Sequence, residues 1–306
     1  MTIDNNDMVW LSYHLYVGRH YELMDELLTG AVTQLRKAYG QHGSFFIRFV
    51  DEGGPHVRIR FRVPLAEQKD VDREVMVAAT RDLDRLSSLP PSLYVPLVRY
   101  EQQAEPFIFS ESWDAPVEIR RKAYEPEWDV YGDRGAGMDI SEQLFDVSSD
   151  LAQEVLALEK AGLPNLRKTL ATALADQVLA VLVPERERDE FLNFYASYWL
   201  AATSLEGTIQ ERSRQKIDEL RAAGIAVIAD PAQLDPRAAA IISRWEESLK
   251  STVRRYQTET QVFNASQMQK LRFNYLHLMN NRLGINALEE GYLATLMHFD
   301  NSRVDL

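Results

Sequence analysis

Residues 53–64, GGPHVRIRFRVP, alternate between apolar and mostly cationic side chains. The apolar positions are Val57, Ile59, Phe61 and Val63. The positions between them hold His56, Arg58, Arg60 and Arg62. Because successive side chains of a strand point to opposite faces, this pattern predicts one face toward a core and a row of cations on the other. Like charges this close repel each other, so an anion is the expected partner of the row.

The first third of the chain predicts a sheet with accompanying helices. Strands are expected where β-branched and aromatic residues cluster, and helices where apolar residues recur every three or four positions. The segment DEGGP, residues 51–55, predicts a hairpin. The expected order is strand 10–17, helix 21–40, strand 44–50, strand 56–63, helix 67–88 and strand 92–100. Residues 101–137 show no regular pattern and are expected to be irregular.

From Ser141 onward the pattern is helical. Asp235 followed by Pro236 predicts the start of one helix, and Asn264 with a glutamine three residues later predicts another that ends before Gly284. The fold class is therefore α+β: an antiparallel sheet with flanking helices in the N-terminal half, then a mostly helical C-terminal half. We expect a single domain over residues 1–306, with a mixed part at 1–137 and a helical part at 138–306.

Composition narrows the possible functions. The net charge of -12 argues against a general nucleic-acid-binding protein, which needs a basic surface. The chain has no cysteine, which excludes disulfides, thiolate zinc sites and cysteine nucleophiles. The segment MTIDNNDMVW lacks the pattern of a signal peptide, and no apolar run approaches the ~18 residues of a membrane span. We therefore expect a cytoplasmic protein that binds neither nucleic acid nor membrane.

The arginine row is the first candidate binding site. If Val50 pairs with His56 across the hairpin, Arg48 faces Arg58 and joins the row, because opposed residues share a face. The planar guanidinium group suits carboxylates and phosphates, so we interpret the row as an anion site. The alternative is an exposed sheet face whose charges prevent edge pairing. The candidate substrate-binding residues here are Arg48, His56, Arg58 and Arg60.

His277 is the candidate acid or base. It belongs to a polar stripe at helical spacing, whose members are Lys270, Asn274, His277 and Asn281. Histidine exchanges protons near neutral pH, which suits acid–base catalysis, and Asn281 is a candidate substrate-binding residue of the same stripe. The alternative is a stripe that faces solvent. The six histidines show no spacing typical of metal ligands, so no metal site is expected.

A third pattern is an aromatic ladder at helical spacing. It consists of Phe191, Phe194, Tyr195, Tyr198 and Trp199. Such a ladder more often packs into a core than binds a ligand. It becomes a binding surface only if the substrate carries aromatic rings to stack on it.

Four segments, in this order, resemble those of the thiopeptide-type bacteriocin biosynthesis domain. They are WLSYHLYVGRHYELMDELL, FFIRFVDEGGPHVRIRFR, YEPEWDVYGD with the following SEQLFDVSSD, and HLMNNRLGINALEE. That domain is the C-terminal, elimination half of class I lantibiotic dehydratases, and it also occurs as a free-standing protein. The resemblance covers nearly the whole chain.

The resemblance implies a ribosomally made precursor peptide as substrate. Elimination members remove glutamate from glutamylated Ser or Thr and leave dehydroamino acids. Free-standing relatives join two dehydroalanines in a formal [4+2] cycloaddition, and loss of water and of the leader peptide gives a pyridine-centred macrocycle. Neither reaction uses a cofactor or a metal, so none is expected. The implied partners are a modified precursor peptide with an acidic leader and other biosynthetic enzymes of the same pathway.

One departure from the family pattern separates the two reactions. Arg58 and Arg60 match the paired arginines that would hold a glutamyl carboxylate, and His277 matches the histidine before NRLG. A further arginine belongs in the family pattern Tyr-x-Pro-Glu-x-x-Arg-Tyr-Gly, and Val130 stands in its place. A missing charge-assisted hydrogen bond costs about 1.5–3 kcal/mol, which argues against elimination.

The sequence therefore favours a pyridine-forming cycloaddition enzyme. His277, Tyr195 and Tyr198 are the candidate catalytic residues, for hydrogen bonds to the reacting amide and for contacts with azole rings. The arginine row would then bind the acidic leader. Two alternatives stay open: a glutamate lyase in which another arginine replaces the missing one, and a non-catalytic partner that binds the leader for another enzyme.

Overall fold

The computed structural model describes residues 7–18, 23–51, 53–88, 116–132, 135–201, 206–260 and 264–301. It contains an antiparallel sheet near the N-terminus followed by a run of helices, which confirms the α+β fold class. The strand order in the sheet is β2-β3-β1-β4. The strands are β1 (Met8–Val17), β2 (Ser44–Asp51), β3 (Gly54–Pro64) and β4 (Val117–Lys122).

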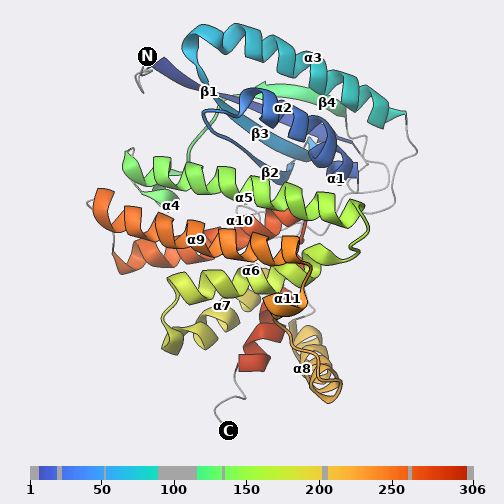
Figure 1. Cartoon of the computed structure of the whole chain (residues 1–306), viewed down its shortest axis with the longest axis vertical. Coiled ribbons are helices and arrows are strands. Elements are labelled where there is room, and N and C mark those ends of the chain that lie inside the picture. Colours follow the sequence, from blue (N-terminus) through green and yellow to red (C-terminus); the bar gives the residue numbers. More distant parts are fainter. Residues whose placement is uncertain are drawn as a thin grey trace.

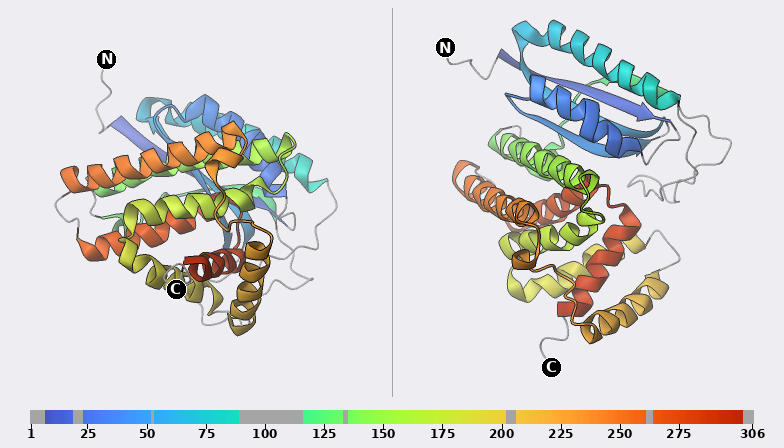
Figure 2. Two further views of the ribbon diagram at one scale, coloured as in Figure 1. Left: turned by 60° about the horizontal axis from the view of Figure 1, so that its bottom comes forward. Right: turned by 45° about the vertical axis from the view of Figure 1, so that its right-hand side comes forward.

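Helices from the N-terminal part cover the apolar face of the sheet (Figure 2). The hydroxyl of Tyr13 on β1 donates to Asp72 of the longest of these helices at 2.7 Å. Val57, Ile59 and Phe61 of β3 are fully buried, so the core face expected from the alternation is confirmed. The covering elements are α1 (Met24–Leu27), a π-helical turn (Leu28–Val32), α2 (Thr33–Tyr39), a 3₁₀ turn (Leu65–Glu67) and α3 (Gln68–Ser87).

The other helices stack below the sheet in the view of Figure 1. One connected set of buried apolar side chains runs through both parts, while the expected single domain stays a prediction. In the described part of the chain, no helix has both the length and the apolar character needed to cross a membrane. The helices are α4 (Trp128–Tyr131), α5 (Ala136–Lys160), α6 (Leu166–Leu182), α7 (Arg188–Leu200), α8 (Glu206–Ala222), α9 (Pro236–Glu259), α10 (Ala265–Leu283) and α11 (Ala287–Asn301), with 3₁₀ turns at Glu185–Glu187 and Pro231–Gln233.

The register of the β2–β3 hairpin differs from the expected one. Val50 pairs with Pro55 rather than with His56, so only two residues connect the strands. Arg48 consequently lies opposite an apolar residue of β3 and on the other face from Arg58. The prediction that Arg48 joins the arginine row is wrong, because a shift of one residue in register moves every side chain of a strand to the opposite face.

Side chains of the helical part cover the outer edge of β2. Ser149 of α5 accepts a hydrogen bond from the Phe46 amide at 3.1 Å. The Asn281 amide of α10 accepts from the Arg48 N–H and donates to the Arg48 carbonyl, both at 2.8 Å. An open strand edge otherwise presents unpaired backbone groups. Asn281 therefore pairs with β2 much as a neighbouring strand would, and it fixes α10 to the sheet.

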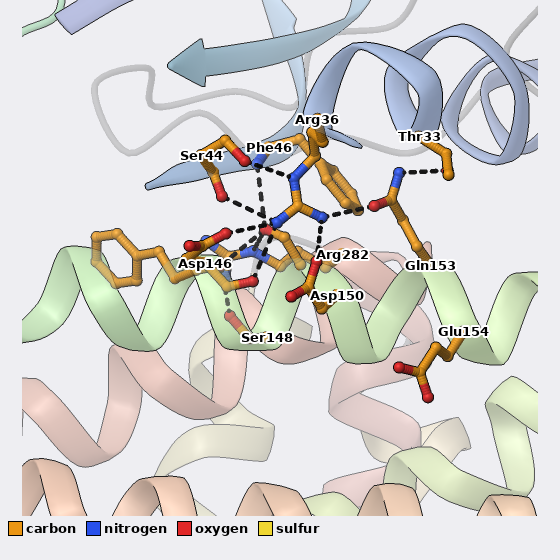
Figure 3. Close-up of polar contacts among 12 residues, drawn as sticks. Thr33, Arg36, Ser44, Phe46, Asp146, Ser148, Asp150, Gln153, Glu154 and Arg282 are labelled. Atoms are coloured by element: carbon orange, nitrogen blue, oxygen red, sulfur yellow. Dashed lines mark hydrogen bonds and ion pairs between the residues drawn. The ribbon is translucent and has the colours of Figure 1, made fainter. Parts of the chain in front are cut away.

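A buried polar cluster joins α2, α5 and α10 (Figure 3). Arg36 of α2 forms ion pairs with Asp146 at 2.7 Å and with Asp150 at 2.9 Å. Arg282 of α10 is fully buried and donates to the Ser149 hydroxyl at 3.1 Å, and burial lowers its pKa to about 9. Buried polar groups held by several partners fix the geometry of the elements that carry them. The sheet, α5 and α10 thus form one frame.

The expected helix boundaries in the C-terminal half are confirmed. The Asp235 side chain accepts from the backbone of the first turn of α9, and Asn264 accepts from the Gln267 amide at 2.9 Å. Gly284 ends α10 with φ 81°, a left-handed conformation that glycine adopts without strain. A side chain there would also start 2.9 Å from the Arg48 guanidinium carbon, so the end of the Arg48 side chain would have to shift.

Two elements lie where the sequence predicted irregular structure. β4 and α4 both fall within residues 101–137. β4 reads VEIRRK, and three charged residues in succession hide its short alternation. The expected strand at 92–100 lies outside the described residues.

Candidate active site

A cavity of about 1640 Å³ lies between the edge of the sheet and the helical part. Its walls come from β2, the segment around α4, α7, α10 and the start of α11. The polar stripe of α10 faces this cavity, with Lys270, Asn274, His277 and Asn281 all in its lining. The polar stripe of α10 therefore faces a cavity that five elements enclose.

A buried carboxylate holds His277 in the cavity wall. The Nδ1 atom of His277 is 3.0 Å from Glu290 Oε1, and the Glu290 side chain is only 1% exposed. The other oxygen of Glu290 accepts from the Tyr195 hydroxyl, and from the Asn280 amide at 3.4 Å. Burial and the adjacent carboxylate raise the pKa of Tyr195, which keeps its hydroxyl a donor. A carboxylate acceptor at Nδ1 favours the tautomer that leaves the basic lone pair on Nε2.

Aromatic rings form the wall beside His277. The Trp199 ring centre is 4.6 Å from that of His277, and Phe273 stacks edge-on against Tyr198 at 4.8 Å. Phe194 lines the same wall and is 58% exposed, whereas large apolar side chains are usually covered. The aromatic ladder thus divides: some of its rings pack inside, and others offer a surface for flat rings in the cavity.

The segment around α4 closes another side of the cavity. Two side chains of α10 hold its backbone: Gln267 donates to the Val130 carbonyl and Lys270 to the Asp129 carbonyl, both at 2.6 Å. Val130 is one of the lining residues. The position where the resemblance expects an arginine therefore holds an apolar residue in the lining of the cavity that contains His277.

The charges around the cavity do not favour the binding of an anionic ligand. Arg48 pairs with Asp25 at 2.6 Å, and Arg272 pairs with Glu187 at 3.0 Å. Complementary charge is what attracts a charged ligand, and here acidic side chains prevail in the lining while these two guanidiniums are already paired. The acidic lining residues that the structure describes are Glu127, Asp129, Glu187, Glu190 and Glu290, and the basic ones are Arg48, Lys270 and Arg272.

The row of cations lies beside the cavity on the face of the sheet that bears Arg58. Two residues of β4 extend it, because Arg120 and Lys122 share that face by register. Aromatic rings offset the repulsion between these cations. The Arg58 guanidinium is 3.4 Å from the centre of the Phe49 ring, and Phe49 itself lines the cavity. We call this surface the cation face, and it consists of Arg58, Arg60, Arg62, Arg120 and Lys122.

Arg60 is the buried centre of the cation face. It is 9% exposed, its guanidinium lies 4.8 Å from the Tyr124 ring, and its Nε has no hydrogen-bond partner in the described part of the chain. Burial lowers the pKa of Arg60 to about 10. Tyr124 donates to Glu142 at 2.7 Å, and burial raises the pKa of that carboxyl to about 7. Arg60 thus keeps one buried donor without a partner among the described residues.

Two histidines beside the cation face are neutral near pH 7. Burial, then the charge of Arg58, lowers the pKa of His14 to about 3, and burial lowers that of His56 to about 4. With Asp51 they bring ligand-type atoms within 4.8 Å of one another. However, His56 Nδ1 lies 2.8 Å from the Gly54 carbonyl and its Nε2 accepts from Arg58 at 3.1 Å. Both ring nitrogens are therefore committed, and this cluster favours a hydrogen-bonded network over a metal centre.

The structure places most candidates from the sequence either in the cavity lining or on the sheet face that bears the cations. Arg58 and Arg60 belong to the cation face, and His56 lies beside them. Tyr195 lies behind His277 and outside the lining. Sequence reasoning missed Glu290, because an acidic pair near the start of a helix looks like an ordinary favourable charge at a helix N-terminus. The candidates in the lining are His277, Tyr198, Arg48 and Asn281.

The chain matches a family model described as "Lantibiotic biosynthesis dehydratase C-term" over residues 10–299. No curated protein matches the chain. Among solved structures it is similar to "Pyridine synthase, TbtD, from thiomuracin biosynthesis", with a TM-score of 0.65 and 19% identity over 96% of this chain and 98% of that one.

Two further structures share the architecture. The tRNA-dependent lantibiotic dehydratase MibB from Microbispora sp. 107891 has a TM-score of 0.59 and 18% identity, and the match covers 99% of this chain and 29% of MibB. TsrL has a TM-score of 0.58 and 13% identity, over 98% of this chain and 96% of TsrL. This chain therefore corresponds to less than a third of MibB, and at these identities the likeness concerns the fold.

Proposed function

The chain belongs to the lantibiotic biosynthesis dehydratase C-terminal family, and from this premise we propose that it is a pyridine-forming enzyme acting on a ribosomal precursor peptide. The reaction is a formal [4+2] cycloaddition between two dehydroalanines. The similarity to the pyridine synthase TbtD over nearly the full length of both chains supports this proposal.

The observation that carries the proposal is the lining of the cavity around His277. A histidine oriented by a buried carboxylate stands there beside aromatic rings, with valine in place of the expected arginine. A glutamylated substrate brings a carboxylate that needs a cation, whereas dehydroalanines and azoles are neutral. The acidic lining suits the neutral substrate better.

The cycloaddition is redox-neutral. The amide before the first dehydroalanine moves its proton from nitrogen to oxygen and becomes an imidic acid, which supplies the four-atom diene. One new carbon–carbon bond joins the two methylene carbons, and the other joins the imidic carbon to the α-carbon of the second dehydroalanine. Loss of water from the imidic carbon and of the leader peptide, as an amide, from that α-carbon gives the pyridine.

His277 exchanges the protons in this scheme. Its lone pair on Nε2 accepts the amide proton, and the imidazolium returns it to oxygen. Tyr198 and the neighbouring rings hold flat azoles of the substrate, which keeps the two dehydroalanines together. Orientation of this kind lowers the activation free energy by up to roughly 7–11 kcal/mol in well-aligned cases. Arg48 and Asn281 line the same cavity.

A glutamate lyase is the second candidate function. The pair Arg58 and Arg60 favours it, because the Arg60 Nε has no partner among the residues that the structure describes and a carboxylate would satisfy that donor. Elimination would then use the cation face. An arginine elsewhere in the chain would replace the one that is missing at position 130 and complete the site. Arg134, the nearest such residue in the sequence, lies outside the described residues.

Mass spectrometry of two incubations tests these functions. One peptide carries the leader, azoles and dehydroalanines, and the other is glutamylated. We expect the first to lose the mass of the leader amide plus water and the second to remain unchanged. Loss of glutamate from the second peptide would make the protein a lyase, and two unchanged but bound peptides would make it a leader-binding partner.

The same assay with Val130→Arg addresses the missing arginine. In a lyase whose carboxylate site still lacks this cation, the variant raises glutamate loss by about tenfold or more, since a charge-assisted bond contributes about 1.5–3 kcal/mol. In a lyase whose site another arginine already completes, the variant leaves glutamate loss unchanged. In the cycloaddition function it lowers pyridine formation, because it adds a cation and bulk to the cavity. Val130→Leu is the control, as it adds bulk without charge.

The cation face is proposed to bind the acidic leader. Arg58 and Arg62 are half-buried and Lys122 is exposed, so these side chains can reach a bound peptide. We expect the dissociation constant of the leader to rise several-fold between low and high salt, because salt screens exposed charges. The double change Arg58→Gln with Lys122→Gln removes most of this dependence, whereas Arg73→Gln on α3 leaves it. Equal affinity at both salt concentrations would contradict the assignment.

A further inference from the structure

Glu290 has no ion-pair partner among arginines or lysines, although it is almost fully buried in the described structure. Three donors converge on its two oxygens instead: the His277 imidazole, the Tyr195 hydroxyl and the Asn280 amide. Burying a carboxylate is costly unless hydrogen bonds compensate for it. A purely structural contact at this place could be apolar, so the carboxylate points to a task that needs its charge.

The contacts of Glu290 define that task. Its Oε1 lies against Nδ1 of His277, and its Oε2 is held from behind by Tyr195 and Asn280. The carboxylate therefore has little freedom to rotate away from the imidazole. The Trp199 ring at 4.6 Å restricts the imidazole from its flat side.

We propose that Glu290 is a positioning residue that keeps the proton of neutral His277 on Nδ1 and stabilises the imidazolium formed during the reaction. This inference rests on the proposed function of His277 as proton carrier. Tyr195 acts through its hydrogen bond to Glu290: it fixes the carboxylate and does not touch the substrate. This proposed role of Tyr195 behind the histidine differs from the substrate contact that the sequence predicts.

The test is the tautomer of His277, observed through the ¹⁵N signals of its ring in protein labelled at histidine. The signals are identified by their disappearance in His277→Gln. We expect the wild-type protein at pH 8 to carry the proton on Nδ1. In Glu290→Gln the side-chain amide can donate to Nδ1, so the proton moves to Nε2. Tyr195→Phe keeps the carboxylate and should keep the wild-type tautomer.

Turnover of the dehydroalanine peptide is measured in the same variants. Glu290→Gln should lower kcat by about 10- to 10³-fold with little change in KM, since a positioning residue cannot cost more than the proton transfer it supports. Tyr195→Phe should cost less than about tenfold. Glu290→Asp restores the charge, and any recovery in it should appear in kcat.

The two hypotheses fail in different ways. A wild-type proton on Nε2, or an unchanged tautomer in Glu290→Gln, overturns the positioning role without reference to any reaction. A tautomer that switches as expected while kcat stays at the wild-type value upholds the positioning contact and overturns the proposed catalytic use of His277. The wild-type measurement remains decisive even if Glu290→Gln does not fold.

Discussion

Replacing His277 with alanine is expected to lower the rate of pyridine formation by about 10²–10⁴-fold, the usual contribution of a positioned general acid or base. The dissociation constant of the peptide should change only a few-fold, because the aromatic wall of the cavity remains. Single-turnover rates and binding by calorimetry or anisotropy separate the two quantities.

Asn274→Ala is the matched control for this variant. Asn274 lies about one turn before His277 on the same face of α10 and lines the same cavity. Among the described residues its amide bonds only its own helix, at 2.8 Å. We expect less than a tenfold effect on the rate. Equal losses in the two variants would mean that the cavity tolerates no change at all, and His277 would lose its special role.

The largest effect on stability is expected at Asp25. Its carboxylate bridges Arg48 of β2 and Arg167 of α6, both at 2.6 Å, and Arg167 also pairs with Glu159. Asp25→Ala leaves the Arg48 guanidinium, which is 5% exposed, without a carboxylate. We expect the free energy of unfolding to fall by about 2–3 kcal/mol, somewhat less than the roughly 3–5 kcal/mol of a fully buried pair, because Asp25 is partly exposed. Denaturant titration measures this.

The effect of Asp25 should depend on pH. Burial raises the pKa of this carboxyl, but Arg48 and Arg167 outweigh burial and leave it below its usual range. A carboxyl with a lowered pKa stabilises the folded state above its ordinary range and loses that contribution as pH falls through the folded-state value. The difference between wild type and Asp25→Ala should therefore shrink in acid.

Asp70→Ala is the control for the ion pair. Asp70 pairs with Arg73 on the exposed face of α3, and both side chains are mostly in solvent. Exposed pairs of this kind contribute less than about 1 kcal/mol. Similar losses for Asp25→Ala and Asp70→Ala would show that the bridge between the sheet and α6 does not matter for stability.

The candidate residues show where sequence reasoning succeeds. His277 and Tyr198 were chosen from a polar stripe and an aromatic ladder, and both line the cavity. Spacing along a helix places side chains on a common face, so such a pattern is visible in the sequence. Spacing does not tell what the face opposes, and for that reason spacing alone favours a stripe that faces solvent.

Arg48 and Glu290 show where sequence reasoning fails. The face of Arg48 depended on a hairpin connection of two residues rather than five, and a single residue of register reverses the face. Glu290 lies 13 positions after His277 on another helix, and only the turn between α10 and α11, with α11 packed against α7, brings the carboxylate to the imidazole. Neither outcome has a local signal.

The sequence by itself determined the periodicities of this protein: an α+β order of elements, the core face of β3, the caps of α9 and α10, and the resemblance to one family. These features depend on neighbours within about one helical turn or along one strand, where chain geometry fixes the spacing. The tertiary structure decided which faces meet: the cavity around His277, the carboxylate behind it, and the extension of the cation face by β4. Such contacts join residues far apart in the chain, and the balance of burial, charge and register over the whole fold selects them.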